Sequence, residues 1–193
     1  GQKVLGVPEG GEAPDDTGDM TVLQAPLTKL GCFSTTHATL FHAIGALDKV
    51  SLVTTDKDKW HIEQVAQQIE DGTTTYVGKN SAPDYELISA AAPQIILISA
   101  NTMHGSDEVL AKLDELGIPY IADSQHLENH PLGRVEWVKL VGALLDMEEE
   151  ADAYFDEEVQ RVNAVAESVA GESEHPTILQ TYIFKGTVYV RHG

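Results

Sequence analysis

The sequence predicts an α/β lobe of three layers, in which helices cover both faces of a mostly parallel sheet. From residue 30 to residue 122, short apolar runs alternate with segments of helical periodicity. This alternation is typical of βαβ units, whose crossovers place helices on both faces of a sheet. The run Ile95–Ile98 is apolar without a break, as expected of a strand that is buried on both faces. Pro93 precedes this run and cannot continue a helix, so a helix must end before the strand begins.

Strands are expected where short apolar runs are bounded by turn residues. In chain order these are residues 22–25, 30–33, 50–53, 74–77, 95–99, 118–122, 178–184 and 187–190. Helices are expected where apolar residues recur at spacings of three and four. They comprise a helix capped by Ser34 or Thr35 and ending near Gly45–Asp48, a short helix around Glu86, and residues 60–71, 107–116, 132–146 and 148–170.

The short helix around Glu86 has a predicted beginning and a predicted buried face. Ser81 and Asp84 are spaced as in a capping box, which satisfies free N–H groups at a helix start. Leu87, Ile88 and Ala91 share the face that we expect to turn inward. Glu86 points elsewhere, and the helix dipole alone would favour an acid in this first turn.

The charge balance is strongly acidic, with 31 Asp and Glu against 12 Lys and Arg and a net charge of −19. Such a surface repels nucleic acid and anionic membranes, which we therefore discount as partners. It favours a basic partner surface, although solubility or a salty habitat would select the same composition.

The single cysteine, Cys32, stands in an apolar context. It excludes an intramolecular disulfide and a CxxC site, and we expect a buried thiol. No apolar run approaches the ~20 residues of a transmembrane helix, and no signal peptide is present. Because leaders are cleaved, the compartment stays open at this point.

The loops that follow the predicted strands are the place to look for a ligand site. In such sheets, ligands bind outside the carboxyl ends of the strands. The polar residue types in these loops suit a pocket for a polar small molecule, including one that carries a metal. The loops are residues 34–37, 54–60, 78–81, 100–106 and 123–130.

Signatures of metal centres and of enzymes are missing from the sequence. His126 and His130 are four residues apart, a spacing that places two metal ligands on one face of a helix. Pro131 disfavours helix at His130, so this spacing does not indicate a metal site. HExxH, GxGxxG, GxxxxGK[ST] and GxSxG are all absent. We therefore expect neither a metal site built by the protein alone, nor an intrinsic cofactor, nor an enzyme.

Several segments resemble the class III extracytoplasmic solute-binding proteins of bacterial ABC importers, which capture ferric siderophores, haem and cobalamin. Residues 34–50 (STTHATLFHAIGALDKV) look like the first loop and helix of that family, and residues 85–98 (YELISAAAPQIILI) like its acid, short helix and apolar strand. Residues 128–157 carry the most specific similarity, to one branch of the family, and residues 187–193 (TVYVRHG) resemble a turn early in its second lobe. Pro93-Gln94 stands where the family usually has Pro-Asp.

The resemblance implies two α/β lobes joined by a long helix, with the ligand held between them and delivered to a membrane permease. We expect a flexible arm at 1–20, the first, chelatase-like lobe at 21–147, the interlobe helix at 148–171, and at 172–193 the truncated start of a second lobe. A hairpin that follows a long helix is marginal by itself, which also favours a further lobe. The resemblance further implies an extracytoplasmic monomer, either periplasmic or a lipoprotein, whose signal peptide is absent from this chain.

By motif, Glu86 matches the glutamate with which the family docks onto the permease dimer. Ligand contacts are assigned by loop position alone, to Thr36, His37, Trp60, Asn80, Met103, His104, His126 and Tyr189. An axial ligand to haem could come from Met103, His104 or Tyr189. The acidic surface argues against a strongly anionic siderophore.

Two alternatives remain open at this point. The histidines are compatible with a zinc or manganese receptor that has a similar rigid helix. The alternation of strands and helices is also compatible with a small doubly wound enzyme domain, because that architecture hosts many chemistries.

Overall fold

The computed structural model describes residues 2–100, 106–174 and 177–190. The chain divides into two compact units, residues 1–159 and 160–193, and each is described by itself.

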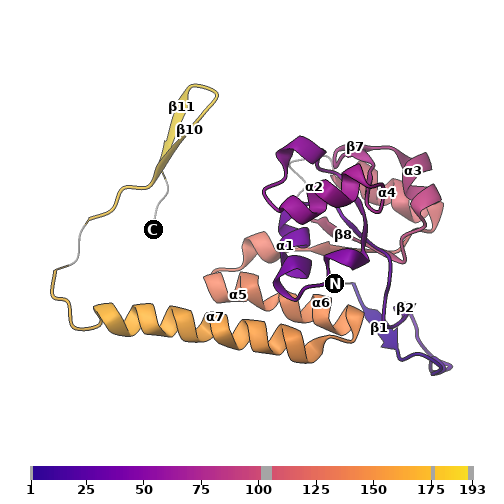
Figure 1. Ribbon diagram of the computed structural model, residues 1–193, viewed down its shortest axis with the longest axis horizontal. Coiled ribbons are helices and arrows are strands. Elements are labelled where there is room, and N and C mark those ends of the chain that lie inside the picture. Colours follow the sequence, from indigo (N-terminus) through magenta and orange to yellow (C-terminus); the bar gives the residue numbers. More distant parts are fainter. Residues whose placement is uncertain (1, 101–105, 175–176, 191–193) are drawn as a thin grey trace. The chain divides into compact units, whose positions relative to one another are not determined.

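The first unit is built on a five-stranded sheet with the strand order β5-β4-β3-β8-β9. Its strand β8 is labelled in Figure 1. Its strands are β3 (Leu30–Cys32), β4 (Val50–Val53), β5 (Thr75–Tyr76), β8 (Ile95–Ser99) and β9 (Tyr120–Asp123). Every neighbouring pair is parallel, which confirms the predicted α/β class. The chain builds the sheet outward from β3 in one direction and then from β8 in the other. The direction of winding therefore reverses between β3 and β8.

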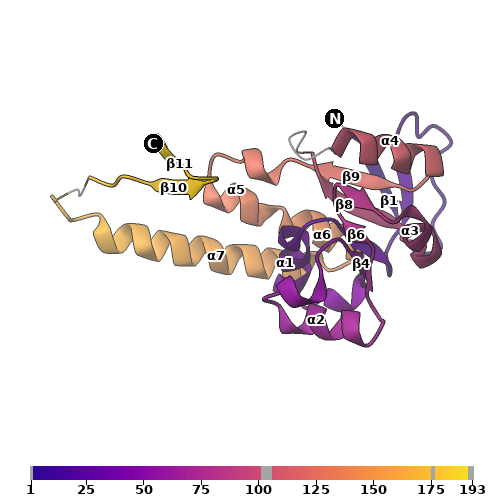
Figure 2. The same ribbon diagram turned by 90° about the horizontal axis from the view of Figure 1, so that it is seen from above.

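Helices cover both faces of this sheet (Figure 2). Successive residues of a strand point to opposite faces, so Ile95 and Leu97 join one apolar cluster and Ile96 and Ile98 join the other. The first cluster packs under α1 (Thr35–Ala43), α2 (Glu63–Glu70) and α6 (Val138–Leu145), and the second under α3 (Tyr85–Ala91) and α4 (Ser106–Leu116).

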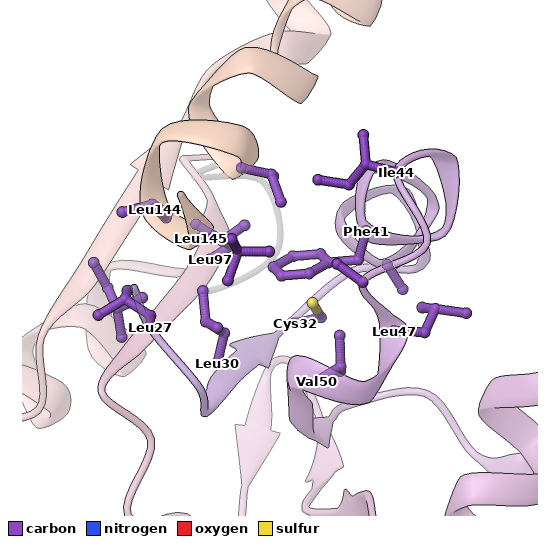
Figure 3. Close-up of a cluster of buried hydrophobic side chains, with 14 of the residues drawn as sticks. Leu27, Leu30, Cys32, Phe41, Ile44, Leu47, Val50, Leu97, Leu144 and Leu145 are labelled. Atoms are coloured by element: carbon purple, nitrogen blue, oxygen red, sulfur yellow. The ribbon is translucent and has the colours of Figure 1, made fainter. Parts of the chain in front are cut away.

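The first cluster forms the larger core. Figure 3 shows Phe41 of α1, Leu97 of β8 and Leu145 of α6 pointing into one space, with the sulfur of Cys32 beside the Phe41 ring. Phe41 and Leu30 are fully buried, and Cys32 is 1% exposed. The buried thiol that the sequence predicts is thus confirmed. Burying a side chain of the size of Leu or Phe contributes about 1.5–3 kcal/mol, so this cluster dominates the stability of the lobe.

The segment 132–146, expected to be one helix, consists of two. They are α5 (Pro131–Glu136) and α6, and Trp137 stands between them. α7 (Glu148–Val169) follows and continues into the second unit. Its beginning packs tightly on α6, because a Cβ at Gly142 would lie 2.7 Å from Cβ of Ala151.

Two local predictions for α3 are wrong. The N-cap is Asp84 alone, whose Oδ1 accepts from the N–H groups of Glu86 and Leu87 at 3.0 and 3.1 Å. Ser81 takes no part in the cap and lies in the turn between β6 (Gly78–Lys79) and β7 (Ala82–Pro83). Leu87 is 41% exposed, whereas Ile88 is fully buried, because seven helical residues against the sheet leave a narrow inward face.

The N-terminal segment contains a strand that the sequence analysis did not anticipate. β1 (Val4–Val7) pairs in parallel with β2 (Thr21–Gln24), while residues 10–19 between them form the expected loop. The side chain of Gln2 also joins the edge strand β9, accepting from the N–H of Ala122 at 2.7 Å and donating to the carbonyl of Tyr120 at 3.1 Å. A four-residue strand with a distant partner carries too little local pattern to be recognised.

The second unit contains the rest of α7 and a two-stranded hairpin. β10 (Thr181–Phe184) and β11 (Thr187–Val190) are antiparallel around the turn Lys185-Gly186, which confirms the predicted hairpin. Tyr182 and Tyr189 face each other across it, with ring centroids 5.0 Å apart. Within the described residues, no helix combines the length and apolar character needed to span a bilayer.

Candidate functional site

A cavity of about 470 Å³ opens at the carboxyl ends of the parallel strands in the first unit. Its walls come from the segments that follow β3, β4 and β5 and from the end of β8, so it lies where the direction of winding reverses. This is the position at which doubly wound sheets bind their ligands. The described lining residues are Phe33, Ser34, Thr35, Thr54, Thr55, Asp56, Lys59, Tyr76, Lys79, Asn80, Ser81, Ile98 and Ser99.

The wall that follows β3 is the first turn of α1. Ser34 has extended backbone and caps the helix, accepting from the N–H of Thr36 at 3.2 Å, as one of the two predicted caps. Ser34 and Thr35 therefore stand at the positive end of the helix dipole, next to the cavity. The first turn of α1 carries no acidic residue, although the chain has 31.

The wall that follows β4 is held by hydrogen bonds to backbone carbonyls. The hydroxyl of Thr54 donates to the carbonyl of Phe33 at 3.0 Å, which ties this loop to the one after β3. The indole N–H of Trp60 donates to the carbonyl of Thr55 at 3.0 Å. Asp56 caps the short 3₁₀ turn η2 (Lys57–Lys59) by accepting from the N–H of Asp58 at 3.2 Å, and η2 brings Lys59 to the cavity.

The third wall is the small hairpin β6–β7, which separates β5 from α3. It leaves the sheet where the N–H of Val77 donates to the carbonyl of Val53 at 2.9 Å. Gly78 has a φ of 87°, a left-handed conformation that glycine adopts without strain. Its Cβ would also lie 3.2 Å from the carbonyl oxygen of Ala82. The hairpin thereby presents Lys79, Asn80 and Ser81 at the rim of the cavity.

The described lining residues carry two cations, Lys59 and Lys79, and one acid, Asp56. Both lysines are exposed, and no ion pair among the described residues holds either of them. The cavity is thus a locally positive region on a chain whose net charge is −19. Hydroxyl groups of Thr55, Tyr76, Ser81 and Ser99 add donors and acceptors to the same lining.

His37 does not line the cavity and is buried. Its ring is 1% exposed, and its Nε2 shares a hydrogen bond with Oδ2 of Asp123, which is 2% exposed and ends β9. Burial alone would raise the pKa of Asp123, but the hydrogen bond and charge of His37, with the N–H of Gln125 at 3.2 Å from Oδ1, lower it below its ordinary value. Within the described part of the chain, Nδ1 of His37 has no partner. The pair joins α1 to the edge of the sheet.

The other residues assigned by loop position are distributed over the molecule. Asn80 lines the cavity, and Trp60 supports a lining residue from behind. Thr36 is exposed beside Ser34 but outside the lining, and His126 lies in the 3₁₀ turn η4 (Gln125–Leu127), also outside it. Tyr189 belongs to β11 in the second unit. Met103 and His104 fall outside the described residues.

Three of the five predicted loops, residues 34–37, 54–60 and 78–81, contribute to the described lining, and residues 123–130 do not. Lys59, Tyr76, Lys79 and Ser99 line the cavity and were not selected. The loops 54–60 and 78–81 contain three lysines, Lys57, Lys59 and Lys79, so the available signal was a group of cations following strands of a strongly acidic chain.

Glu86 lies on the exposed side of α3, one turn beyond the hairpin that carries Lys79. The helix follows β5, so its first turn is near the same carboxyl edge as the cavity, although Glu86 does not line it. Among the described residues, no three His, Cys, Asp or Glu side chains lie together as a metal centre would need.

Comparison with known proteins gives consistent results. The family model of periplasmic binding proteins matches residues 32–192. An uncharacterized lipoprotein of Methanocaldococcus jannaschii is 35% identical over 152 residues, which are 75% of this chain and 36% of that protein.

Among solved structures, the fold is similar to that of the petrobactin-binding protein YclQ from Bacillus subtilis, with a TM-score of 0.67 and 15% identity over 87% of this chain and 55% of that one. It is also similar to the periplasmic haem-binding protein HutB of Vibrio cholerae, with a TM-score of 0.64 and 18% identity over 84% of this chain and 58% of that one. The chain thus spans about half the length of these structures and about a third of the lipoprotein.

Proposed function

This chain belongs to the periplasmic binding protein family, and on that premise we propose that it is part of the substrate-binding component of an ABC importer. The full protein would capture a metal complex outside the cytoplasm and release it to a permease. A protein of this kind binds its ligand without converting it. The lipoprotein among its relatives supports a lipid anchor as the means of staying at the membrane.

The observation that carries the proposal is the cavity at the winding reversal. Its volume of about 470 Å³ falls in the range of small-molecule sites, about 300–1,000 Å³. Loops far apart in the sequence converge there on one polar lining, which is the form that a binding site takes in this class of sheet. On the two-lobe organisation that the resemblance implies, this lining is the share of the ligand site that the first lobe contributes.

We propose a ferric siderophore or haem as the ligand. The names of three proteins with a similar fold mention petrobactin, haem, and a complex of acinetobactin with ferric iron. Cobalamin, which the resemblance also allows, finds no such support among them. A zinc or manganese receptor would need a cluster of metal ligands, and the described residues contain no such cluster.

The test is a binding screen of the full-length protein. Ferric siderophores of several classes, haem, cobalamin and zinc are titrated by calorimetry, and intrinsic fluorescence is followed in parallel. Trp60 is a suitable reporter, because its indole N–H holds the carbonyl of Thr55 in the cavity wall. Saturable binding of an iron complex or haem is the expected result. Binding of zinc alone, or of none of these, would contradict the proposal.

Glu86 is the residue we propose for docking onto the permease. It is exposed, it stands near the ligand edge of the lobe, and the resemblance assigns it by motif. Charged groups at the rim of an interface steer and orient association more than they stabilise it. We therefore expect Glu86→Lys to reduce ligand uptake while the Kd for the ligand stays within about twofold of wild type.

The matched control is Glu63→Lys, since Glu63 is also an exposed acid in the first turn of a helix that follows a strand of the same sheet. Uptake is measured with both variants in cells or in vesicles with the permease. Equal uptake by the two variants would remove Glu86 from the docking surface.

A further inference from the structure

We infer that the ligand presents negative charge to this lobe, as an anionic metal chelate does and a neutral one does not. This inference rests on the proposed function and names the chemical class of its ligand. It runs against the expectation from overall charge, because a net charge of −19 by itself argues against an anionic ligand.

The first step is the contrast between the lysines of the cavity and those elsewhere. Of the six lysines of the first unit outside the cavity lining, five pair with carboxylates at 2.7–3.8 Å, as expected where acids are abundant, and the sixth, Lys29, is exposed with no ion pair among the described residues. The five paired lysines are Lys3, Lys49, Lys57, Lys112 and Lys139. Lys59 and Lys79 belong to no ion pair among the described residues, although the chain has 31 acidic residues to offer. Two cations without ion pairs thus line one cavity.

The second step is the acid in the lining. Asp56 is the acidic residue among the described lining residues, and its Oδ1 accepts from the N–H of Asp58 at 3.2 Å to cap η2. Its carboxylate therefore stabilises the turn in its own loop. The formal charge of the described lining is positive, because two lysines outnumber this one acid.

The third step is the polarity of the remaining lining. The N-terminal end of α1, with Ser34 and Thr35, faces the cavity, and a helix start favours negative charge. Hydroxyls of Thr55, Ser81 and Ser99 supply further donors. Catecholate and carboxylate oxygens of a chelate are the acceptors that match lysine ammonium and hydroxyl donors. On an otherwise acidic surface, such local positive charge favours the entry of anionic ligands over neutral ones.

The experiment compares two ferric complexes that have the same metal and the same number of donor oxygens. A ferric tris-catecholate is trianionic, and a ferric tris-hydroxamate is neutral. Affinities of both for the full-length protein are measured by calorimetry at low and at high salt. The variants are Lys59→Gln with Lys79→Gln, and Lys57→Gln as the control. Lys57 lies in the same turn, but its Nζ pairs with Glu70 at 3.8 Å and it does not line the cavity.

We expect the anionic complex to bind at least about tenfold more tightly than the neutral one. The double variant should lose about two- to thirtyfold in affinity for the anionic complex, as two exposed ion pairs would, and its affinity for the neutral one should stay the same. Added salt should weaken the binding of the anionic complex to the wild type and leave the binding of the neutral complex unchanged. Lys57→Gln should match the wild type.

Tighter or equal binding of the neutral complex, or an unchanged affinity of the double variant for the anionic one, overturns this inference and leaves the proposed function standing. If neither iron complex binds and haem does not bind either, the proposed function fails and the inference fails with it. The lysine side chains are exposed, so the variants should fold as the wild type does. Matching thermal unfolding curves verify this.

Discussion

The buried pair of His37 and Asp123 is the basis of a quantitative prediction. The variant His37→Leu removes the partner of a carboxylate that is 2% exposed and leaves its charge uncompensated in the interior. Leaving a buried carboxylate without its partner in this way costs about 3–5 kcal/mol in the free energy of unfolding. Asp123→Leu should cost about 1–3 kcal/mol, because it leaves polar groups of His37 and the N–H of Gln125 without their acceptor.

The double variant should be far less destabilised than the sum of the two singles. Apolar replacement of both partners removes the unpaired charge, so the loss should fall to about 1–3 kcal/mol, mainly from the N–H of Gln125. The cycle then gives a coupling of about 4 kcal/mol between the two side chains. Urea unfolding at neutral pH, followed by tryptophan fluorescence, measures all four proteins.

The pH dependence provides the control. The pKa of Asp123 is lowered in the folded state, so its contribution is fully present above the ordinary value of 3.8 and is lost as the pH falls through the lower folded pKa. Without His37, burial raises the pKa of Asp123, so the stability gap between wild type and His37→Leu should begin to shrink above pH 3.8 and should continue to shrink as the pH falls through the lowered pKa of the wild type. A coupling under about 0.5 kcal/mol, or a gap independent of pH, would refute the reasoning.

Two further predictions concern packing and cysteine chemistry. Gly142→Ala should destabilise the chain by about 1–3 kcal/mol, because its Cβ would lie 2.7 Å from Cβ of Ala151 and 2.9 Å from the carbonyl oxygen of Met147. Gly6→Ala, where nothing lies within 4 Å, is the control in the same urea unfolding experiment, and equal losses would contradict the packing argument. Cys32 should resist alkylation in the native protein, since burial leaves it 1% exposed and raises the pKa of its thiol. It should react fully in denaturant, as followed by mass spectrometry, and rapid native labelling would count against a buried thiol.

Local pattern was sufficient for most elements of the lobe. The unbroken apolar run Ile95–Ile98 lies in β8, and Pro93 stands before this strand. Ser34 caps α1, and the hairpin around Lys185-Gly186 is present. These features depend on residues close in sequence, whose periodicity and backbone preferences act before any tertiary contact forms.

Features that depend on partners distant in the chain were not predicted from the sequence. β1 exists because Val4–Val7 pairs with a strand that begins at Thr21. His37 looked like a residue at the end of a strand that faces a ligand, yet its partner Asp123 comes from β9, 86 positions away, and draws the ring into the interior. Of the described residues that were assigned to the ligand by loop position, Asn80 lines the cavity.

The sequence by itself determined the α/β class, the order of most of the elements, and a resemblance specific enough to single out a family; the docking role of Glu86 within it stays a prediction. Tertiary structure alone decided the strand order β5-β4-β3-β8-β9, and with it which loops meet. That order places Ser34, Thr55, Lys59, Lys79 and Ser99 around one cavity. The physical reason is that periodicity reports which face of an element is buried, whereas strand neighbours follow from how all the faces pack together. A positive cavity on an acidic chain is a product of that packing.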